Sequence, residues 1–266
     1  MASASSSFTG PEYYNDCIGP IWFDPFAADL VRRLPQRPRG DVLEIACGTG
    51  IVTRKLRERV DPSLRLLATD LSPVMLDYAR AKLGDHKGIE WREADALQLP
   101  FQDHSFGAVV CGFGIMFVPD RQAMLREARR VLVDGGILLF NVWDRIDENP
   151  HAAVNASVVE AMFPGDAELR FRVPYDMNDL GLLRQLLAGA HFRETLIETK
   201  RIGIQGADPR AIATGQIRGT PRAALMERRG VSLDLVIGKV ADALAKAGGD
   251  PYSGYAQAIV VQAAAV

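Results

Sequence analysis

Apolar and polar positions follow two different patterns between residues 41 and 144. Short apolar runs alternate with segments in which apolar residues recur every three or four positions. The runs span 41–47, 64–70, 89–95, 105–114 and 136–144, and the periodic segments span 51–60, 73–84 and 121–132. This alternation indicates βαβ units and a parallel sheet, whose right-handed crossovers place helices on both faces. We therefore expect an α/β fold with a doubly wound, Rossmann-like sheet.

Capping residues mark the ends of the expected helices. Ser72 and Pro73 stand at the N-cap and first-turn positions of the helix over 73–84, and Gly84 falls at its end. The pair Gly135 and Gly136 is expected to close the helix that ends at Leu132 and to open the next strand.

The regular alternation stops after Asp144. Residues 146–177 hold one short helical pattern, several Pro and Gly breaks and the aromatic residues Phe163, Phe171 and Tyr175. Because this segment follows the carboxyl end of an expected strand, where open α/β sheets bind ligands, it is a candidate lid. The alternative is a solvent-facing insertion that only packs on the sheet.

The C-terminal part returns to the sheet. A helix is expected over 177–190, a strand over 191–204 and a last strand over 252–266, and about forty residues with helical periodicity separate the two strands. Such an insertion is too long for a hairpin turn. The expected organisation is an N-terminal tail and entry helix (1–40), a ligand-binding core (41–145), a lid-like insertion (146–177), and a C-terminal part of the core (178–266) with a helical insertion at about 206–250.

Composition narrows the class of protein. A formal net charge of -2 over 266 residues gives no global field that would attract nucleic acid or anionic lipid. Cys17, Cys47 and Cys111 are far apart and lack metal-type spacing, so neither a disulfide framework nor a metal site is expected, and a reducing cytoplasm fits best. The start, MASASSSFTG, does not resemble a secretory signal, and no apolar run reaches the length of a membrane helix. We expect a small-molecule partner; the sequence does not define an oligomeric state.

The stretch VLEIACGTG, residues 42–50, runs from an expected strand into two glycines. Gly48 and Gly50 let the main chain turn sharply and approach a ligand closely at the start of a helix. Asp70 follows twenty residues later at the end of the second strand, where Rossmann-like folds hold a carboxylate against a ribose diol. Asp95 and Ala96, after the third strand, stand where a carboxylate and an amide could meet the edge of an adenine base. Taken alone, an aspartate at this position is more often a cap or turn residue; its register with Gly48, Gly50 and Asp70 is what makes Asp95 a binding candidate.

Two residues argue against a dinucleotide. Thr53 stands where the pattern G-x-G-x-x-G requires a third glycine, and Glu44 would add negative charge near a pyrophosphate. A carboxylate near the loop suits a ligand with an ammonium or sulfonium group. A nicotinamide-dependent oxidoreductase is kept as an alternative.

The segments VLEIACGTG, ATDLSPVML, EADALQLPFQDHSFGAVVCGFGIMFVPD and MLREARRVLVDGGILLFNVWD resemble the class I S-adenosylmethionine-dependent methyltransferases, in particular the branch that acts on quinones and other small molecules. The resemblance covers residues 41–144. It implies about seven strands, mostly parallel with the last antiparallel, helical insertions that form a lid or cap, and S-adenosylmethionine as cofactor. The cofactor residues that it implies are Glu44, Ala46, Gly48 and Gly50 at the methionine end, Asp70, Leu71 and Met75 at the ribose and adenosine, Asp95 and Ala96 at the adenine, and Cys111, Gly112 and Phe113 at the methionine and sulfonium side. Ala46 departs from the usual first glycine of E-x-G-x-G-x-G, and its methyl group is small enough for binding to survive.

The reaction expected from the resemblance is methyl transfer to a small apolar or aromatic acceptor at oxygen, nitrogen or carbon, which leaves S-adenosylhomocysteine. A base is needed only where the acceptor must lose a proton, and no residue stands out; weak candidates are His151, Tyr13, Tyr14 and Tyr175, whereas His86, His104 and His191 suit solvated or capping roles. Candidates for an apolar acceptor pocket are Trp22, Phe23, Phe117, Trp143, Phe163 and Phe171. Arg170 and Arg172 could pair with an acidic substrate or simply form a solvated face.

Two further alternatives also assume that the protein binds S-adenosylmethionine. The first is an enzyme that uses the cofactor for chemistry other than methyl transfer, such as a cyclisation that gives methylthioadenosine. The other alternative is a non-catalytic cofactor-binding module that regulates a partner.

Overall fold

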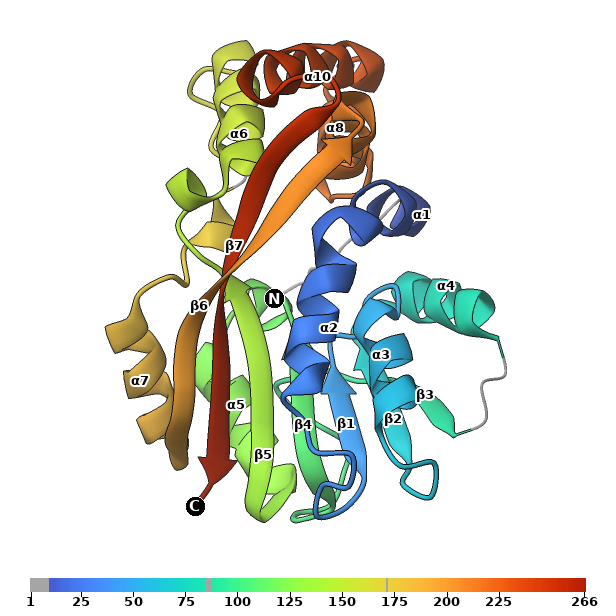
Figure 1. The fold of residues 1–266 in the computed structure, drawn as a ribbon, viewed down its shortest axis with the longest axis vertical. Helices are drawn as coiled ribbons and strands as arrows, with labels where there is room; N and C mark the ends of the chain where they lie inside the picture. The colour runs from blue at the N-terminus through green and yellow to red at the C-terminus, as the bar shows by residue number, and fades with distance from the viewer. Residues whose placement is uncertain (1–9, 85–87, 171) are drawn as a thin grey trace. The chain divides into compact units, whose positions relative to one another are not determined.

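A computed structural model describes residues 10–84, 88–170 and 172–266, and their strands form one seven-stranded sheet in the order β3-β2-β1-β4-β5-β7-β6 (Figure 1). The strands are β1 (Val42–Ile45), β2 (Leu66–Asp70), β3 (Ile89–Glu93), β4 (Phe106–Gly112), β5 (Leu132–Trp143), β6 (Phe192–Ala207) and β7 (Tyr252–Ala265). β1 to β5 pair in parallel and β7 pairs antiparallel to β5, with Asn141 opposite Val260. The expected doubly wound sheet with an antiparallel last strand is confirmed.

Helical segments connect the strands. The α-helices are α1 (Pro11–Tyr13), α2 (Asp24–Arg32), α3 (Ile51–Arg59), α4 (Pro73–Leu83), α5 (Arg121–Val131), α6 (Pro150–Met162), α7 (Leu180–Gly189), α8 (Pro209–Arg218), α9 (Arg222–Arg228) and α10 (Leu233–Gly248). A π-helical segment, η1 (Tyr14–Phe23), joins α1 to α2, and short 3₁₀ turns lie at η2 (Ile115–Phe117), η3 (Ile146–Glu148) and η4 (Val173–Tyr175). No helix among the described residues is both long and apolar enough to cross a membrane.

The chain divides into two compact units. The sheet unit comprises Phe26–Asp144, Val173–Lys200 and Ala258–Val266, and the helical unit comprises Met1–Pro25, described from Gly10, together with Arg145–Arg172 and Arg201–Gln257. The segment 146–177 is therefore shared between the units, and its closure as a lid stays a prediction.

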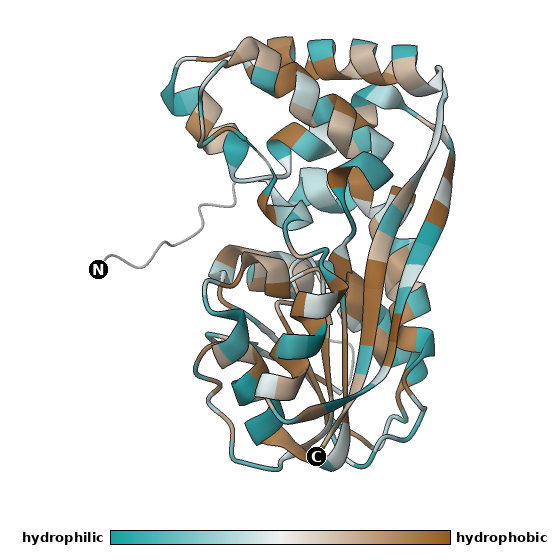
Figure 2. Ribbon diagram, turned by 90° about the vertical axis from the view of Figure 1, so that its left-hand side faces the viewer, coloured by the Kyte–Doolittle hydropathy of each residue, from teal (hydrophilic) through white to brown (hydrophobic). Residues whose placement is uncertain are grey.

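The core of the sheet unit explains why these elements form. Figure 1 shows α2 and α3 on one face of the sheet and α5 on the other, where α7 packs beside α5. β1 and β4 are buried along nearly their whole length, as expected for parallel strands covered on both faces, whereas β6 is largely exposed. Figure 2 shows brown and teal segments mixed along the strands. One face is sealed by Leu30 of α2, Leu34 just after it and Leu56 of α3, which pack on buried residues of five neighbouring strands. Burial of one such leucine contributes about 1.5–3 kcal/mol.

The helical unit has its own apolar core. α10 packs on α6 and α8, and α8 packs on η1. Ile212 and Ile217 of α8 are fully buried. Val236, Val240 and Leu244 of α10 are fully buried too, at the four-residue spacing of one helix face.

Local signals place helix ends correctly in one case and wrongly in another. Ser72 Oγ accepts from the main-chain N–H of Met75, and Gly84 ends α4 with a left-handed φ of 62°, as the sequence predicts. The expectation for Gly135 and Gly136 is wrong, because α5 ends at Val131 and both glycines lie within β5. Gly135, with φ of 71°, lies where the pairing of β4 with β5 changes register, so it serves a bulge instead of a helix cap.

Candidate functional site

The glycine loop joins the carboxyl end of β1 to the N-terminus of α3. Gly50 has a φ of 83°, and a Cβ there would lie 3.0 Å from Leu83 Cδ1 and 3.2 Å from Ala79 Cβ, so conformation and packing both require glycine. Gly48 has a φ of 54°, but a Cβ there would meet nothing within 4 Å. The space above Gly48 is therefore open to a ligand.

Asp70 ends β2 beside this loop. Its Oδ2 accepts from the main-chain N–H of Gly48 at 2.8 Å, and its Oδ1 accepts from the N–H of Ser72 at 2.9 Å. Burial raises the pKa of Asp70, and these main-chain hydrogen bonds oppose the rise. One carboxylate thus joins the loop after β1 to the loop after β2, at the edge of the sheet where doubly wound folds bind ligands.

Glu44 lies inside β1 and is only 1% exposed. Burial raises its pKa to about 8, the charge of Asp70 adds to the rise, and the hydroxyl of Thr53 offsets it only in part. Its Oε2 has no hydrogen-bond partner within the part of the chain that the structure describes. The sequence suggested a ready negative charge here; the structure places instead a buried carboxyl group that is largely protonated near neutral pH.

Ala46 occupies the left-handed region with a φ of 56°, the conformation for which glycine is usual. Its methyl group lies against the turn after β4, because a Cβ on Gly114 would come within 2.5 Å of Ala46 Cβ. Alanine is therefore accommodated at this position by a glycine in a different loop.

The residues expected at the adenosine differ in exposure. Leu71 is 57% exposed directly after Asp70, whereas Met75 is buried in α4. Asp95 is exposed after β3, and its Oδ1 accepts from the N–H of Leu97 at 2.9 Å, which is the turn role that it has when taken alone. Ala96, next to it, is half-buried.

Cys111, Gly112 and Phe113 follow one another at the carboxyl end of β4. The Cys111 thiol is fully buried, and burial raises its pKa to about 12. A Cβ on Gly112 would lie 2.7 Å from Val52 Cγ2, so α3 approaches β4 closely here. Phe113 has a φ of 55°.

An aromatic cluster surrounds Phe113 within the sheet unit. Its ring centroid lies 4.3 Å from that of Trp143 and 5.4 Å from that of Phe26, and Trp143 stacks on Tyr175 at 6.0 Å. All four rings are buried. Trp143, one of the residues expected at the acceptor pocket, belongs to this cluster. Tyr175, a base candidate, belongs to it too.

Phe117 lies in a groove of about 700 Å³ on the sheet unit. Phe117 and Val173 are 56% and 50% exposed and Leu186 adds apolar surface, while Asp120 and Arg121 supply charges of opposite sign. The volume suits a small molecule.

The other acceptor candidates belong to the helical unit. Trp22 and Phe23 are buried, and the Phe23 ring packs on Tyr14 at 4.5 Å. Phe163 is half-buried at the end of α6, and Phe171 lies outside the described residues. The expectation that some of the six aromatic candidates line an acceptor pocket stays a prediction.

The two arginines for which the sequence left an acidic substrate and a solvated face open lie on a polar surface. Arg172 is exposed and its Nε donates to Glu160 Oε1 at 2.9 Å, and Arg170 is exposed too. This is the solvated face that the sequence offered as the alternative.

His151, a weak base candidate from the sequence, is buried in the helical unit. Its ring stacks on Trp22 at 4.2 Å, and its Nδ1 lies 3.0 Å from Gln216 Nε2. Burial lowers its pKa to about 3, so the ring is neutral near pH 7 and a weak base. Tyr13, another base candidate, carries Arg218 against its ring face at 5.7 Å.

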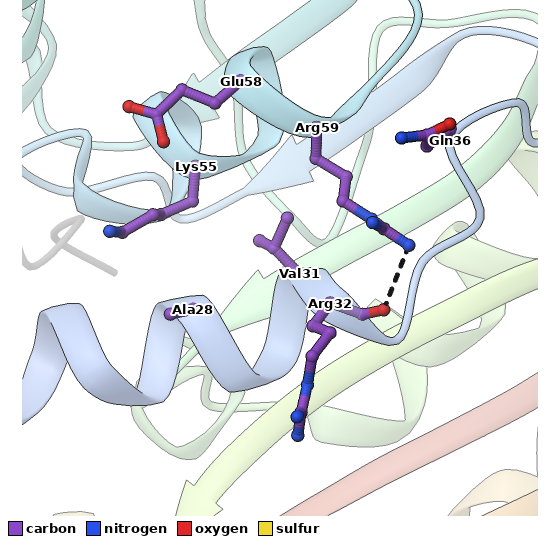
Figure 3. A pocket seen from close by; sticks show the side chains of 7 residues that line it. All are labelled: Ala28, Val31, Arg32, Gln36, Lys55, Glu58 and Arg59. Carbon is purple, nitrogen blue, oxygen red and sulfur yellow. Dashed lines mark hydrogen bonds between the residues drawn. The ribbon is translucent and has the colours of Figure 1, made fainter.

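A second groove, of about 270 Å³, lies between α2 and α3 (Figure 3). It is lined by Arg32, Lys55 and Arg59, together with Glu58 and apolar side chains. Figure 3 shows that Arg59 donates to the main-chain oxygen of Arg32, so this arginine ties two helices together. Neither of these two grooves includes the glycine loop or Asp70.

Sequence reasoning missed several buried polar residues. Asn141 in β5 is 1% exposed, and in the helical unit Asn155 Nδ2 donates to Gln216 Oε1 at 2.9 Å. Asn141 had a usable signal, since it is the one polar residue in the strand segment ILLFNVW. Asn155 and Gln216 had no such signal, because they bond to each other across 61 residues of sequence.

The sequence of this chain is similar to known methyltransferases over part of its length. Residues 43–140 match the family model described as a methyltransferase domain. Demethylmenaquinone methyltransferase of Deinococcus radiodurans is 40% identical over 120 residues, which cover 45% of this chain and 48% of the relative. The chain thus matches about half the length of the curated relatives.

Solved structures show the same fold at lower identity. The YcgJ protein of Bacillus subtilis has a TM-score of 0.57 at 17% identity, over 90% of this chain and 98% of that chain. Phosphoethanolamine N-methyltransferase 2 of Haemonchus contortus, solved with S-adenosylhomocysteine, has a TM-score of 0.60 at 17% identity, over 97% of this chain and 57% of that chain.

Proposed function

We propose that this protein, whose residues 43–140 form a methyltransferase domain of class I, transfers a methyl group from S-adenosylmethionine to a small apolar or aromatic acceptor. The observation that carries the proposal is the Asp70 carboxylate, which holds Gly48 at 2.8 Å beneath open space. A carboxylate at the end of β2 and a bare main chain at the end of β1 suit a ribose-containing ligand.

The residues of the loop fit this cofactor. Glu44 Oε2 is buried, and among the described residues it has no partner, so it can accept from the ammonium group of a methionine moiety, directly or through water. Leu71 is an exposed apolar side chain next to Asp70 and suits the face of an adenine. Asp95 can accept from the adenine amine with Oδ2, while its Oδ1 caps the turn.

The cofactor supplies a methyl group already activated on a sulfonium, so the protein has mainly to align acceptor and donor and to exclude water. The cluster of Phe113, Trp143 and Tyr175 provides a dry apolar wall at the carboxyl ends of β4 and β5. Because His151 is buried and neutral, we propose no role for it as a base. We expect acceptors that are nucleophilic without a strong base.

The acceptor that we propose to test first is a demethylated quinone. The name of the Deinococcus radiodurans relative indicates such a substrate for that protein. The groove with Phe117 and Val173, of about 700 Å³, offers apolar surface of suitable size. We place the reaction in the cytoplasm, in keeping with three cysteines that form no disulfide.

Product analysis tests the proposal. The protein is incubated with S-adenosylmethionine labelled in its methyl group and a panel of quinone, phenol and amine acceptors, and products are separated by mass spectrometry. We expect a labelled acceptor and S-adenosylhomocysteine in equal amounts. Methylthioadenosine instead would indicate cyclisation chemistry, and tight binding without turnover of any acceptor would indicate a regulatory module; either result contradicts methyl transfer.

A further inference from the structure

Phe113 has an unusual main-chain conformation. Its φ of 55° lies in the left-handed region, which bulky residues rarely adopt. Such strain persists only where the surroundings impose it, and it is frequent at functional sites. Phe113 directly follows β4, at the ligand-binding edge of the sheet.

Asn141 imposes this conformation from the neighbouring strand. It pairs with Gly112 in the register of β4 and β5. The N–H of Phe113 donates both to the Asn141 main-chain oxygen at 3.2 Å and to its Oδ1 at 3.0 Å. Asn141 is 1% exposed, and a polar side chain buried in a central strand is costly unless it is hydrogen-bonded.

Trp143 fixes the ring of the same phenylalanine. Trp143 and Asn141 are two residues apart in β5 and so point to the same face. The Trp143 ring lies 4.3 Å from that of Phe113, and the Phe26 ring contacts both of them, at 5.4 Å from Phe113 and 5.6 Å from Trp143. One side chain of β5 therefore holds the main chain of Phe113 while another holds its ring.

We propose that Asn141 is a positioning residue: by accepting from the N–H of Phe113 it holds the turn after β4 in the left-handed form that borders the methionine part of the cofactor. The inference rests on the proposed function. It assigns a role to the one polar residue of an otherwise apolar strand segment, and it predicts an effect confined to one end of the ligand.

The experiment measures two affinities for each variant by calorimetry. S-adenosylhomocysteine carries the methionine part, and methylthioadenosine lacks the amino-acid end. Asn141→Leu removes the side-chain acceptor at similar volume and leaves the main-chain one. We expect it to weaken S-adenosylhomocysteine about tenfold and methylthioadenosine less than about twofold. Val142→Ala, at a fully buried position of the same strand, is the control: it lowers the thermal midpoint and leaves the ratio of the two affinities unchanged.

A change at residue 113 separates positioning from a general structural role. Glycine adopts a positive φ without help, so adding Asn141→Leu to Phe113→Gly should change the S-adenosylhomocysteine affinity less than about twofold. Alanine removes the same ring but keeps the strain, so in Phe113→Ala the loss of about tenfold should persist. Asn141→Asp keeps an oxygen acceptor and is expected to keep the affinity ratio, which provides a test should Asn141→Leu not fold.

Three results would overturn the inference. The first is an equal loss of affinity for both ligands in Asn141→Leu. The second is the same loss of S-adenosylhomocysteine affinity on adding Asn141→Leu to Phe113→Gly and to Phe113→Ala. The third is a change in the ratio of the two affinities in Asn141→Asp. If the wild type binds neither nucleoside, the proposed function is wrong instead. Energetic coupling between positions 113 and 141 can then still be measured from urea unfolding of the same variants. Absence of that coupling would overturn the positioning role too.

Discussion

The methyl group of Ala46 fills the space that a side chain at residue 114 would need, since a Cβ on Gly114 would lie 2.5 Å from Ala46 Cβ. The two residues belong to different loops, after β1 and after β4. An alanine in the first loop is thus matched by a glycine in the second, and we expect the two positions to be energetically coupled.

Gly114→Ala should lower the free energy of unfolding by about 1–3 kcal/mol, because the added methyl group overpacks a buried turn. In an Ala46→Gly background the loss should shrink by ~1 kcal/mol, and some should remain because the added methyl group would also lie 2.8 Å from Cys111 Sγ. Urea unfolding of the four proteins measures the coupling.

Gly203→Ala is the control for this cycle. A Cβ at Gly203 meets nothing within 4 Å, so the substitution should be nearly neutral in both backgrounds. An equal loss for Gly114→Ala with and without the Ala46 methyl group would show that the two loops are not coupled.

Glu44 should make the ligand-free protein less stable as pH rises. The pKa of its carboxyl is about 8 in the folded chain against an ordinary value of 4.5. The folded state therefore holds the proton more tightly, and the stability that this provides is complete below pH 4.5 and lost as pH rises through 8. The full effect is on the order of a few kcal/mol.

Glu44→Gln keeps the shape of the side chain and removes the titration. Urea unfolding at several pH values between about 5 and about 8 should show a fall for the wild type that the variant lacks. Parallel curves for the two proteins would mean that the carboxyl group is not held protonated by burial.

His151 should act in the opposite direction. Its pKa is about 3 in the folded chain against an ordinary 6.5, so the unfolded chain binds the proton more tightly. The corresponding stability is present above pH 6.5 and is lost as pH falls towards 3. His151→Gln should lose stability at neutral pH through the lost stack on Trp22, yet show a shallower acid slope than the wild type; identical slopes would contradict the assignment.

Arg172→Ala should have little effect. The side chain is about half exposed and pairs with Glu160 on the surface. Exposed pairs of this kind contribute roughly 0–1 kcal/mol. We expect an unchanged Michaelis constant for the acceptor; an increase of about tenfold would restore the hypothesis that Arg172 binds an acidic substrate.

The sheet could be predicted because its signals are local. β1, β2 and β4 are short, mostly apolar runs, and β3 alternates apolar with charged residues. Ser72 and Gly84 mark the ends of α4 within the sequence itself. The prediction of a helix end at Gly135 was wrong because glycine is common both at helix ends and at β-bulges. Which of the two forms depends on the pairing of β5 with β4.

The candidate site could be predicted only in part. Gly48, Gly50 and Asp70 follow from spacing, and the structure brings Asp70 to Gly48. The protonation of Glu44 and the burial of His151 depend on which elements pack around them, and no local pattern encodes that. The conformation of Phe113 depends in the same way on a partner in the next strand.

The central claim is that Asp70 and the glycine loop bind S-adenosylmethionine, and calorimetric titration tests it most directly. The wild type, Asp70→Ala and the surface control Arg172→Ala are titrated with S-adenosylmethionine, S-adenosylhomocysteine and NADH. The account predicts that both sulfur ligands bind the wild type and the control, that Asp70→Ala loses both, and that NADH does not bind. Binding of NADH without either sulfur ligand would contradict it and would make Gly48, Gly50 and Asp70 a dinucleotide site.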